Sequence, residues 1–223
     1  MSRPTPAQAW AELQRGNERF VAGQPAHPRQ DIDRLSELQN GQSPSVALFG
    51  CSDARLAAEI IFDEGLGDLF VVRNAGQIIS DSVIGSLEYA VDVVGVSLIV
   101  VLGHDNCGAV GGAITLLNPK NRAFPPRVTE MIRKISPAVR RVAGFQKLFG
   151  TDGSFDVDAL DTLEVAREHL RDTISELLEE SELISEAIAA GNLAVVGANF
   201  RLSEGRVVPD VVVGVIEFAS PTP

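Results

Sequence analysis

Two short polar clusters hold both cysteines of this 223-residue chain and one of its three histidines. One cluster is Cys51-Ser52-Asp53-Ala54-Arg55, and the other is His104-Asp105-Asn106-Cys107-Gly108. Two thiolates and one imidazole form a soft donor set that suits Zn²⁺ in tetrahedral coordination with the fourth position free. Such an open zinc site is a catalytic arrangement, because the free position can carry a water that the metal makes acidic. The sequence therefore predicts that Cys51, His104 and Cys107 are zinc ligands.

Each ligand taken alone has a plainer interpretation. A single cysteine is usually a small buried apolar residue, and a Cys51–Cys107 disulfide is conceivable but disfavoured in a reducing compartment. The joint pattern favours a metal, because each cluster follows an apolar run, Val46–Gly50 or Val96–Gly103. Ligand sites of open α/β sheets form at the carboxyl ends of parallel strands, where residues distant in sequence meet.

Asp53 and Arg55 stand two residues apart, beside the first cysteine. On an open surface such a pair would contribute little to stability. Beside zinc the carboxylate has two possible roles, since it can orient a zinc-bound hydroxide or bind the metal as a fourth ligand. The guanidinium of Arg55 can hold Asp53 away from zinc through two parallel hydrogen bonds. We therefore predict a switch between an open site, with Asp53 on Arg55, and a closed site, with Asp53 on zinc.

The elements that must position these residues alternate along the chain. Apolar runs separated by helical segments predict an α/β fold with a mostly parallel central sheet flanked by helices. The turn Ser203–Arg206 indicates a hairpin, so the last strand is expected to run antiparallel at an edge. The predicted strands are Ser45–Gly50, Leu69–Val72, Ser97–Leu102, Leu193–Ala198 and Arg206–Val215. The predicted helices are Ile32–Asn40, Leu56–Glu64, Ser82–Val94, Ala109–Leu117, Thr129–Val142 and one long region, Val157–Ala190, with connections at Pro119–Pro126 and Gly150–Asp156.

We expect one domain, in which an N-terminal helical arm, residues 1–31, precedes a catalytic α/β core, residues 32–223. Thr5 is a predicted N-cap, Pro6 the first helical residue, and Gly23 the end of the arm's helix. Two interpretations of this helix remain open. It either packs on its own core or reaches a partner subunit.

Composition excludes several classes of protein. Apolar residues make up 45% and charged residues 22% of the chain, as in soluble globular proteins. The net charge of −11 argues against a nucleic-acid surface, and no apolar stretch is long enough to span a membrane. The first residues lack the apolar core of a secretory signal, and two cysteines are too few for a disulfide scaffold. We therefore expect a cytoplasmic protein without nucleic-acid or membrane partners.

The paired clusters resemble those of the β-class carbonic anhydrases. That family carries C-S-D-S-R after its first core strand and H-x-x-C-G after a later one. The resemblance implies the family's fold, a zinc ion on Cys51, His104 and Cys107, and an orienting pair formed by Asp53 and Arg55. It also implies reversible hydration of CO2 to bicarbonate and a proton by attack of zinc-bound hydroxide. Since the family's pocket forms at a dimer interface, a homodimer or a dimer of dimers is implied.

The resemblance extends to a substrate pocket. Gln42 matches a loop that supplies a substrate-binding glutamine in the plant-like branch of the family. Phe70 and Tyr89 match apolar pocket walls, although in an unrelated sheet they would be ordinary core residues. Ala75 completes this lining, and the backbone N–H of Gly108, together with Gln42, is expected to face the developing oxyanion.

Other positions separate the branches or depart from the family pattern. Leu48 stands where a bacterial branch with an inhibitory bicarbonate site has tryptophan, so that allosteric site is not expected. Ala54 replaces the usual serine, and Ala75-Gly76-Gln77 replaces the commoner Val-Ala-Asn. Arg73 is either a structural ion-pair partner or a substrate contact. His27 and His169 lie in polar contexts and are expected to be exposed.

Three rival functions remain to be weighed. A hydrolase of carbonyl sulfide or carbon disulfide on the same scaffold would carry identical zinc motifs. A non-catalytic zinc-stabilised interaction protein would not need Asp53 or Arg55. A Rossmann-type nucleotide binder is disfavoured, because the glycines of Gly108–Gly112 lack the G-x-G-x-x-G spacing after the first strand.

Overall fold

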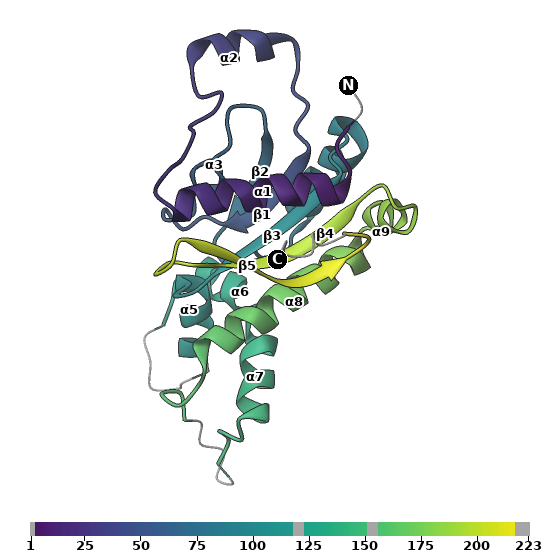
Figure 1. The fold of residues 1–223 in the computed structure, drawn as a ribbon. Coiled ribbons are helices and arrows are strands. Elements are labelled where there is room, and N and C mark those ends of the chain that lie inside the picture. The colour runs from purple at the N-terminus through teal and green to yellow at the C-terminus, as the bar shows by residue number, and fades with distance from the viewer. Residues whose placement is uncertain (1–2, 118–122, 151–155, 217–223) are drawn as a thin grey trace, which may run out of the picture.

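A five-stranded sheet organises the part of the chain that the structure describes (Figure 1). The computed structural model describes residues 3–117, 123–150 and 156–216. The strands are β1 (Val46–Cys51), β2 (Leu69–Asn74), β3 (Leu98–His104), β4 (Ala194–Arg201) and β5 (Arg206–Val213). Their order is β2-β1-β3-β4-β5, with the first four parallel and β5 antiparallel to β4 at the edge. The predicted sheet and its antiparallel last strand are confirmed.

Helices precede, connect and cover the strands. No helix of the described segments is long and apolar enough to cross a membrane. The α-helices are α1 (Pro6–Val21), α2 (Ile32–Glu37), α3 (Ala58–Ile61), α4 (Asp81–Tyr89), α5 (Gly108–Leu116), α6 (Pro126–Arg133), α7 (Ser136–Phe145), α8 (Thr162–Glu180) and α9 (Glu182–Ala189). Two short turns follow α2 and α4, a 3-10 turn η1 (Leu38–Asn40) and a π turn η2 (Ala90–Val94).

The central strands β1, β3 and β4 are buried on both faces of the sheet. Successive residues of a strand point to opposite faces, so each strand contributes to a hydrophobic cluster on either side. Val46 and Leu48 of β1 pack in a cluster with residues of α1, α3, α5 and α7. Ala47 and Phe49 pack in a second cluster with residues of α4, α8 and α9. All six residues of β1 and all seven of β3 are buried, which explains their continuous apolar sequence.

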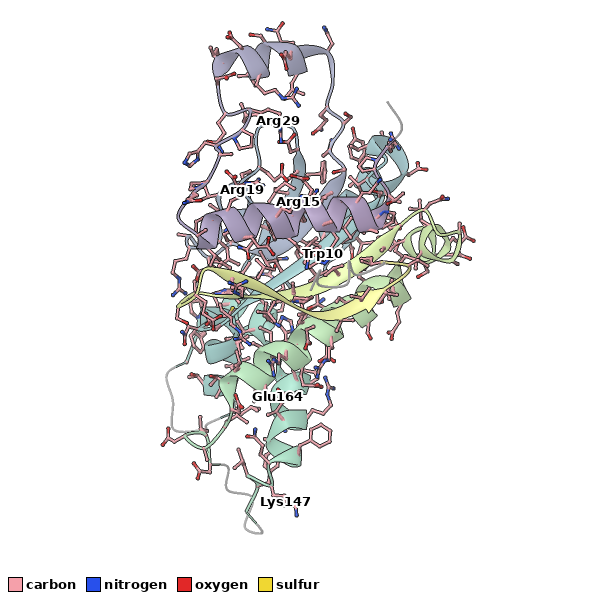
Figure 2. All side chains as sticks on the ribbon, in the orientation of Figure 1. Trp10, Arg15, Arg19, Arg29, Lys147 and Glu164 are labelled. Carbon is pink, nitrogen blue, oxygen red and sulfur yellow. The ribbon has the colours of Figure 1, made fainter. Side chains whose placement is uncertain are left out.

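Helix α1 packs on its own chain, so the first of the two interpretations describes the structure. Thr5 and Gln8 form a reciprocal capping box, and Pro6 begins the helix as predicted. Trp10 is 2% exposed and lies in the cluster beside β1 (Figure 2). The buried amide of Asn17 donates to Ile61 O at 3.1 Å and accepts from Val207 N at 2.9 Å. The helix is thus tied to α3 and β5 of the same copy.

Two predicted helices are interrupted. The segment Thr129–Val142 covers the second half of α6 and most of α7. The two helices are separated just before Pro137, a residue without the N–H needed to continue the helical hydrogen bonds. The long region Val157–Ala190 contains α8 and α9, which meet at Ser181. The buried hydroxyl of Ser181 accepts from Ile184 N at the start of α9 and donates to Glu88 Oε1 at 2.7 Å. The contact with Glu88, a residue of α4, therefore fixes the position at which the helix is interrupted. Parts of the predicted connections Pro119–Pro126 and Gly150–Asp156 lie outside the described residues.

The third helix is also shorter than the predicted Leu56–Glu64. It is a single turn, Ala58–Ile61, because the backbone at Asp63 turns into the left-handed region with φ of 49°. The buried Asp63 carboxylate accepts from Arg19, Ala26 N and His27 N, and thereby secures the chain that follows α1. His27 is exposed, as predicted.

The sheet order places the two polar clusters together. From β1 the chain passes to β2 on one side, and β3 then lies on the other side of β1, so the strand order reverses between β1 and β3. Cys51 is the last residue of β1 and His104 is the last residue of β3. Both therefore lie at the carboxyl edge of the sheet, beside the crevice where ligands bind in open α/β folds.

The docking of α1 can be tested at a glycine. A Cβ added at Gly16 would lie 1.7 Å from the carbonyl oxygen of Phe62, a backbone atom that cannot turn away. We expect Gly16→Ala to lower the free energy of unfolding by about 1–3 kcal/mol through overpacking. Gly144→Ala, in the exposed part of α7 with nothing within 4 Å, is the control. It should leave stability unchanged or raise it by about 0.5–1 kcal/mol. Urea unfolding measures both, and equal stability of the two variants would contradict this packing.

Candidate metal centre

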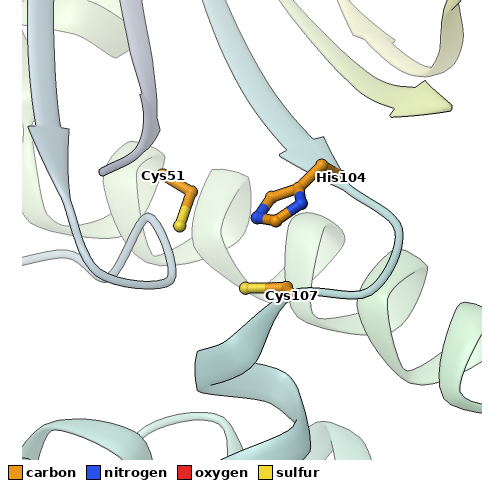
Figure 3. A group of neighbouring side chains, drawn as sticks. All are labelled: Cys51, His104 and Cys107. Carbon is orange, nitrogen blue, oxygen red and sulfur yellow. The ribbon is translucent and has the colours of Figure 1, made fainter. Parts of the chain in front are cut away.

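Three side chains converge at the carboxyl edge of the sheet (Figure 3). Cys51 and His104 end β1 and β3, and Cys107 is the N-cap residue of α5. Their sulfur and ring nitrogen atoms all lie within 4.8 Å of one another, and all three residues are buried. Neither cysteine forms a disulfide. The predicted meeting of the two clusters is confirmed.

The imidazole of His104 is buried and has no hydrogen bond within the described part of the chain. It is 1% exposed, and neither ring nitrogen has a partner among the described residues. Burying a polar group without a partner is costly, so each such group needs an explanation. A cation held between this ring and the two sulfurs would satisfy one nitrogen, and two thiolates with one imidazole are a donor set that zinc prefers. The residues present therefore fit a zinc ion.

The two sulfurs titrate against each other. The neighbouring Cys107 thiol is the largest cause that lowers the pKa of Cys51, and the nearby His104 ring and the Gly76 N–H act in the same direction, whereas burial opposes them. Conversely, the proximity of Cys51 and burial raise the pKa of Cys107. Two adjacent thiolates are therefore unfavourable when no positive charge lies between them. A divalent cation removes that penalty, because thiolates are its ligands.

Asp53 lies beside the three donors and is paired with Arg55. Arg55 donates from Nε to Oδ1 at 2.8 Å and from Nη2 to Oδ2 at 2.7 Å. This two-point hydrogen bond holds the pKa of Asp53 well below its usual range, so the carboxylate stays charged. Its Oδ2 also lies 4.0 Å from Nε2 of His104. The structure thus places Asp53 on Arg55 and next to the donor group.

Backbone contacts hold the loop after β1 in place. Arg73 of β2 donates from Nε to Cys51 O at 2.9 Å and from Nη2 to Asp53 O at 2.6 Å. Arg73 thus stabilises the backbone from Cys51, the last residue of β1, to Asp53 in the loop that follows. Arg55 also donates to Asn106 O at 3.3 Å, which links this loop to the one that follows β3.

The second loop depends on two residues that sequence reasoning did not single out. Asn106 has φ of 51°, a left-handed conformation that asparagine tolerates better than most residues. The carboxylate of Asp105 accepts from Leu202 N at 3.1 Å, which ties the turn to the end of β4. An Asp-Asn pair between His104 and Cys107 is a turn signal that could have predicted this shape.

His169 was expected to be exposed, and that prediction is wrong. It is 4% exposed on α8, and its Nε2 lies 2.7 Å from the carbonyl oxygen of Gly76. Gly76 N in turn donates to Cys51 Sγ at 3.3 Å. The signal was present in the helical spacing, because Val165, His169 and Thr173 fall four residues apart on one buried face. The polar residues that flank His169 in the sequence led to the wrong prediction.

The predicted pocket residues fall into two groups, a first group next to the metal donors and a second group toward the amino end of the sheet. Ala75 follows β2 next to Gly76, and Gly108 begins α5 directly after Cys107, so both adjoin the donor group. In contrast, Phe70 pairs with Ala47, four residues before Cys51, or about 13 Å along the strand. The ring of Tyr89 lies 6.1 Å from that of Phe70 and is half-exposed.

Gln42 belongs to the second group. It is exposed in the loop that leads into β1, and so lies before the amino end of the strand whose carboxyl end carries Cys51. A single copy of the chain therefore separates Gln42 from the donor group by the length of β1, about 17–20 Å. One copy does not assemble the complete predicted pocket.

Comparison with known proteins is consistent with this site. The sequence profile of the family described as carbonic anhydrase matches residues 46–207. Carbonic anhydrase 2 of Mycobacterium tuberculosis is 46% identical over 210 residues, which cover 93% of this chain and 94% of that protein. A carbonic anhydrase of Mycolicibacterium smegmatis is 43% identical over 209 residues, with the same coverages. A structure of tetrameric β-carbonic anhydrases from Sordaria macrospora matches with a TM-score of 0.67 and 26% identity, over 86% of this chain and 92% of that one.

Proposed function

The chain belongs to the β-class carbonic anhydrases, enzymes that hydrate CO2 to bicarbonate, and we propose that it does so with one zinc ion held by Cys51, His104 and Cys107. The observation that carries this proposal is the buried Cys-His-Cys donor group, whose histidine has no other partner among the described residues. Zinc at these donors supplies Lewis acidity that lowers the pKa of water to near neutrality.

Asp53 orients the attacking water or hydroxide in this proposal. It is a charged acceptor next to the donor group, and an acceptor fixes the direction of the O–H bond and of the attacking lone pair. Arg55 keeps Asp53 in that role with two hydrogen bonds. Asp53 released from Arg55 would be free to bind the metal itself, which is the closed state of the proposed switch.

The substrate side combines apolar walls with a few donors. Ala75 provides an apolar surface for CO2 beside the donor group, and the N–H of Gly108 belongs to the first turn of α5, where N–H groups have no partner within the helix. The amino end of a helix favours negative charge, so this N–H is suited to the oxygen of CO2 that becomes anionic. Gln42, Phe70 and Tyr89 complete the pocket.

The proposal also covers the branch of the family, the domain organisation and the cellular compartment. Leu48 is buried within β1, where the branch with an inhibitory bicarbonate site has tryptophan, which supports the plant-like branch. Residues 32–223 are the catalytic core of a single domain, and residues 1–31 are the arm that α1 docks on it. A reducing compartment, the cytoplasm, keeps both thiols available to the metal.

Stopped-flow CO2 hydration tests the proposed function directly. The purified protein should contain about one zinc per chain and accelerate hydration, and removal of zinc by a chelator should abolish the acceleration until zinc is restored. His104→Ala removes one ligand and should lose both zinc and activity. A chelated protein with undiminished activity, or a protein without zinc by elemental analysis, would exclude the proposed site.

Loss of Arg55 tests the orienting pair. Arg55→Ala frees Asp53 to reach the metal, so we expect bound zinc to be retained while kcat/KM falls about 10–100-fold. X-ray absorption should then report an additional oxygen ligand on zinc. Arg127→Ala removes an exposed arginine of α6, 93% exposed, and should leave both measurements unchanged. Wild-type activity in Arg55→Ala would contradict the role given to the pair.

A second copy of the chain supplies Gln42, Phe70 and Tyr89 to this site. In one copy these residues lie toward the amino end of the sheet, whereas Cys51 lies at the carboxyl end. Tyr89, whose ring lies beside that of Phe70, is half-exposed, and Val93 is exposed four residues later, so apolar side chains are available to contact a second copy. The tetrameric state of the Sordaria macrospora relatives supports a homodimer or a dimer of dimers.

Mixed oligomers test whether the site is shared. Asp53→Ala damages the copy that holds the metal, and Gln42→Ala damages the copy that contributes the glutamine. Each homo-oligomer should have low kcat/KM. Coexpression with two tags and purification through both should give mixed dimers in which about half the sites are intact, since a two-fold interface pairs each patch with its counterpart. If both residues act within one copy, the mixed oligomer will show no recovery.

A further inference from the structure

The loop after β2 has an unusual backbone. Gly76 and Gln77 are consecutive residues with positive φ, 85° and 42°. A Cβ added at Gly76 would lie 2.7 Å from Cβ of Ala109, so this position needs glycine for space as well as for conformation. The Asn74 side chain donates to Ile78 O at 2.6 Å and accepts from Ile78 N at 2.8 Å, which closes the loop on itself.

Two side chains of helix α8 contact backbone carbonyl groups of the same loop. His169 Nε2 lies 2.7 Å from Gly76 O, and Thr173 Oγ1 lies 3.3 Å from Gln77 O. A carbonyl oxygen only accepts, so Nε2 of His169 carries the hydrogen and donates it. The two side chains are one turn apart on α8 and therefore reach two successive carbonyls. Nδ1 of His169 has no partner among the described residues, so the ring's one described hydrogen bond is the one to Gly76.

Gly76 connects the His169 side chain of α8 to the metal centre. Its N–H donates to Cys51 Sγ at 3.3 Å, while its C=O accepts from His169, so the residue is held at both ends. An N–H donor withdraws charge from a thiolate, and the hydrogen bonds around a metal ligand tune both its affinity and its electronics. A shift of the Gly76 backbone would weaken that N–H···S contact first.

We propose that His169 is a positioning residue of the metal centre, which holds the Gly76 N–H on the sulfur of Cys51 and thereby sets how strongly that sulfur donates to the metal. The inference rests on the proposed function, because it assumes that Cys51 is a zinc ligand. His169 lies behind the loop and acts through Gly76. It is therefore distinct from Asp53 and Arg55, which lie beside the donor group itself.

Cobalt substitution tests this role, because the thiolate-to-cobalt charge-transfer absorption reports on the sulfur. His169→Leu removes the donor at similar volume, and we expect a shifted charge-transfer band and metal affinity lowered about 10–100-fold in chelator competition. His169→Gln should restore both, since its amide nitrogen can occupy the place of Nε2. His169→Asn should not, because its shorter side chain places the amide at the position of Nδ1.

A stability control separates positioning from packing. Leu170→Ala creates a cavity on the neighbouring face of α8, where Leu170 is fully buried, and should lower stability while leaving the band unchanged. If His169→Leu does not fold, the comparison of His169→Gln with His169→Asn decides. Identical bands and affinities in wild type and in His169→Asn would overturn the inference. Failure of the wild type to bind cobalt or zinc would instead overturn the proposed function.

Discussion

A buried group of two thiols and one imidazole is the constraint on which the rest of this structure depends. Neither nitrogen of the His104 ring has a partner among the residues that the structure describes, and the two sulfurs are close enough to shift each other's pKa in opposite directions. Without a positive charge between them, these groups would be costly to bury. The fold nevertheless brings them together, at the ends of two buried neighbouring strands and the start of a helix.

The surroundings of the donor group show how its geometry is maintained. Arg73 holds two carbonyls of the loop after β1, and Arg55 holds Asp53 and the carbonyl of Asn106. The carboxylate is therefore fixed by a side chain that is half-exposed, whereas Arg73 is anchored to β2. The side chain of Asp53 and the backbone that carries it are therefore held by two different arginines.

Much of this could be predicted from sequence, and the reasons are local. Continuous apolar runs predicted β1 and β3, and the two polar clusters at their ends predicted the donor group, because carboxyl ends of parallel strands meet. Thr5, Pro6 and Gly23 predicted α1, because capping depends on neighbouring residues. The break at Ser181 and the buried position of His169 depend on contacts between distant segments, whereas the break before Pro137 has a local signal in the proline itself. Ser181, for example, meets Glu88 of α4, which no local pattern could indicate.

The arrangement also explains why one chain is insufficient for the proposed pocket. Parallel strands place all of their carboxyl ends at one edge, so residues that precede β1 or begin β2 must lie at the opposite edge. Gln42 and Phe70 are residues of this kind, and no side-chain rotation can span the length of a strand. A residue of that opposite edge can meet a donor group at the carboxyl edge only when a second copy presents it. The proposed pocket, which includes Gln42 and Phe70, therefore depends on the proposed interface between copies.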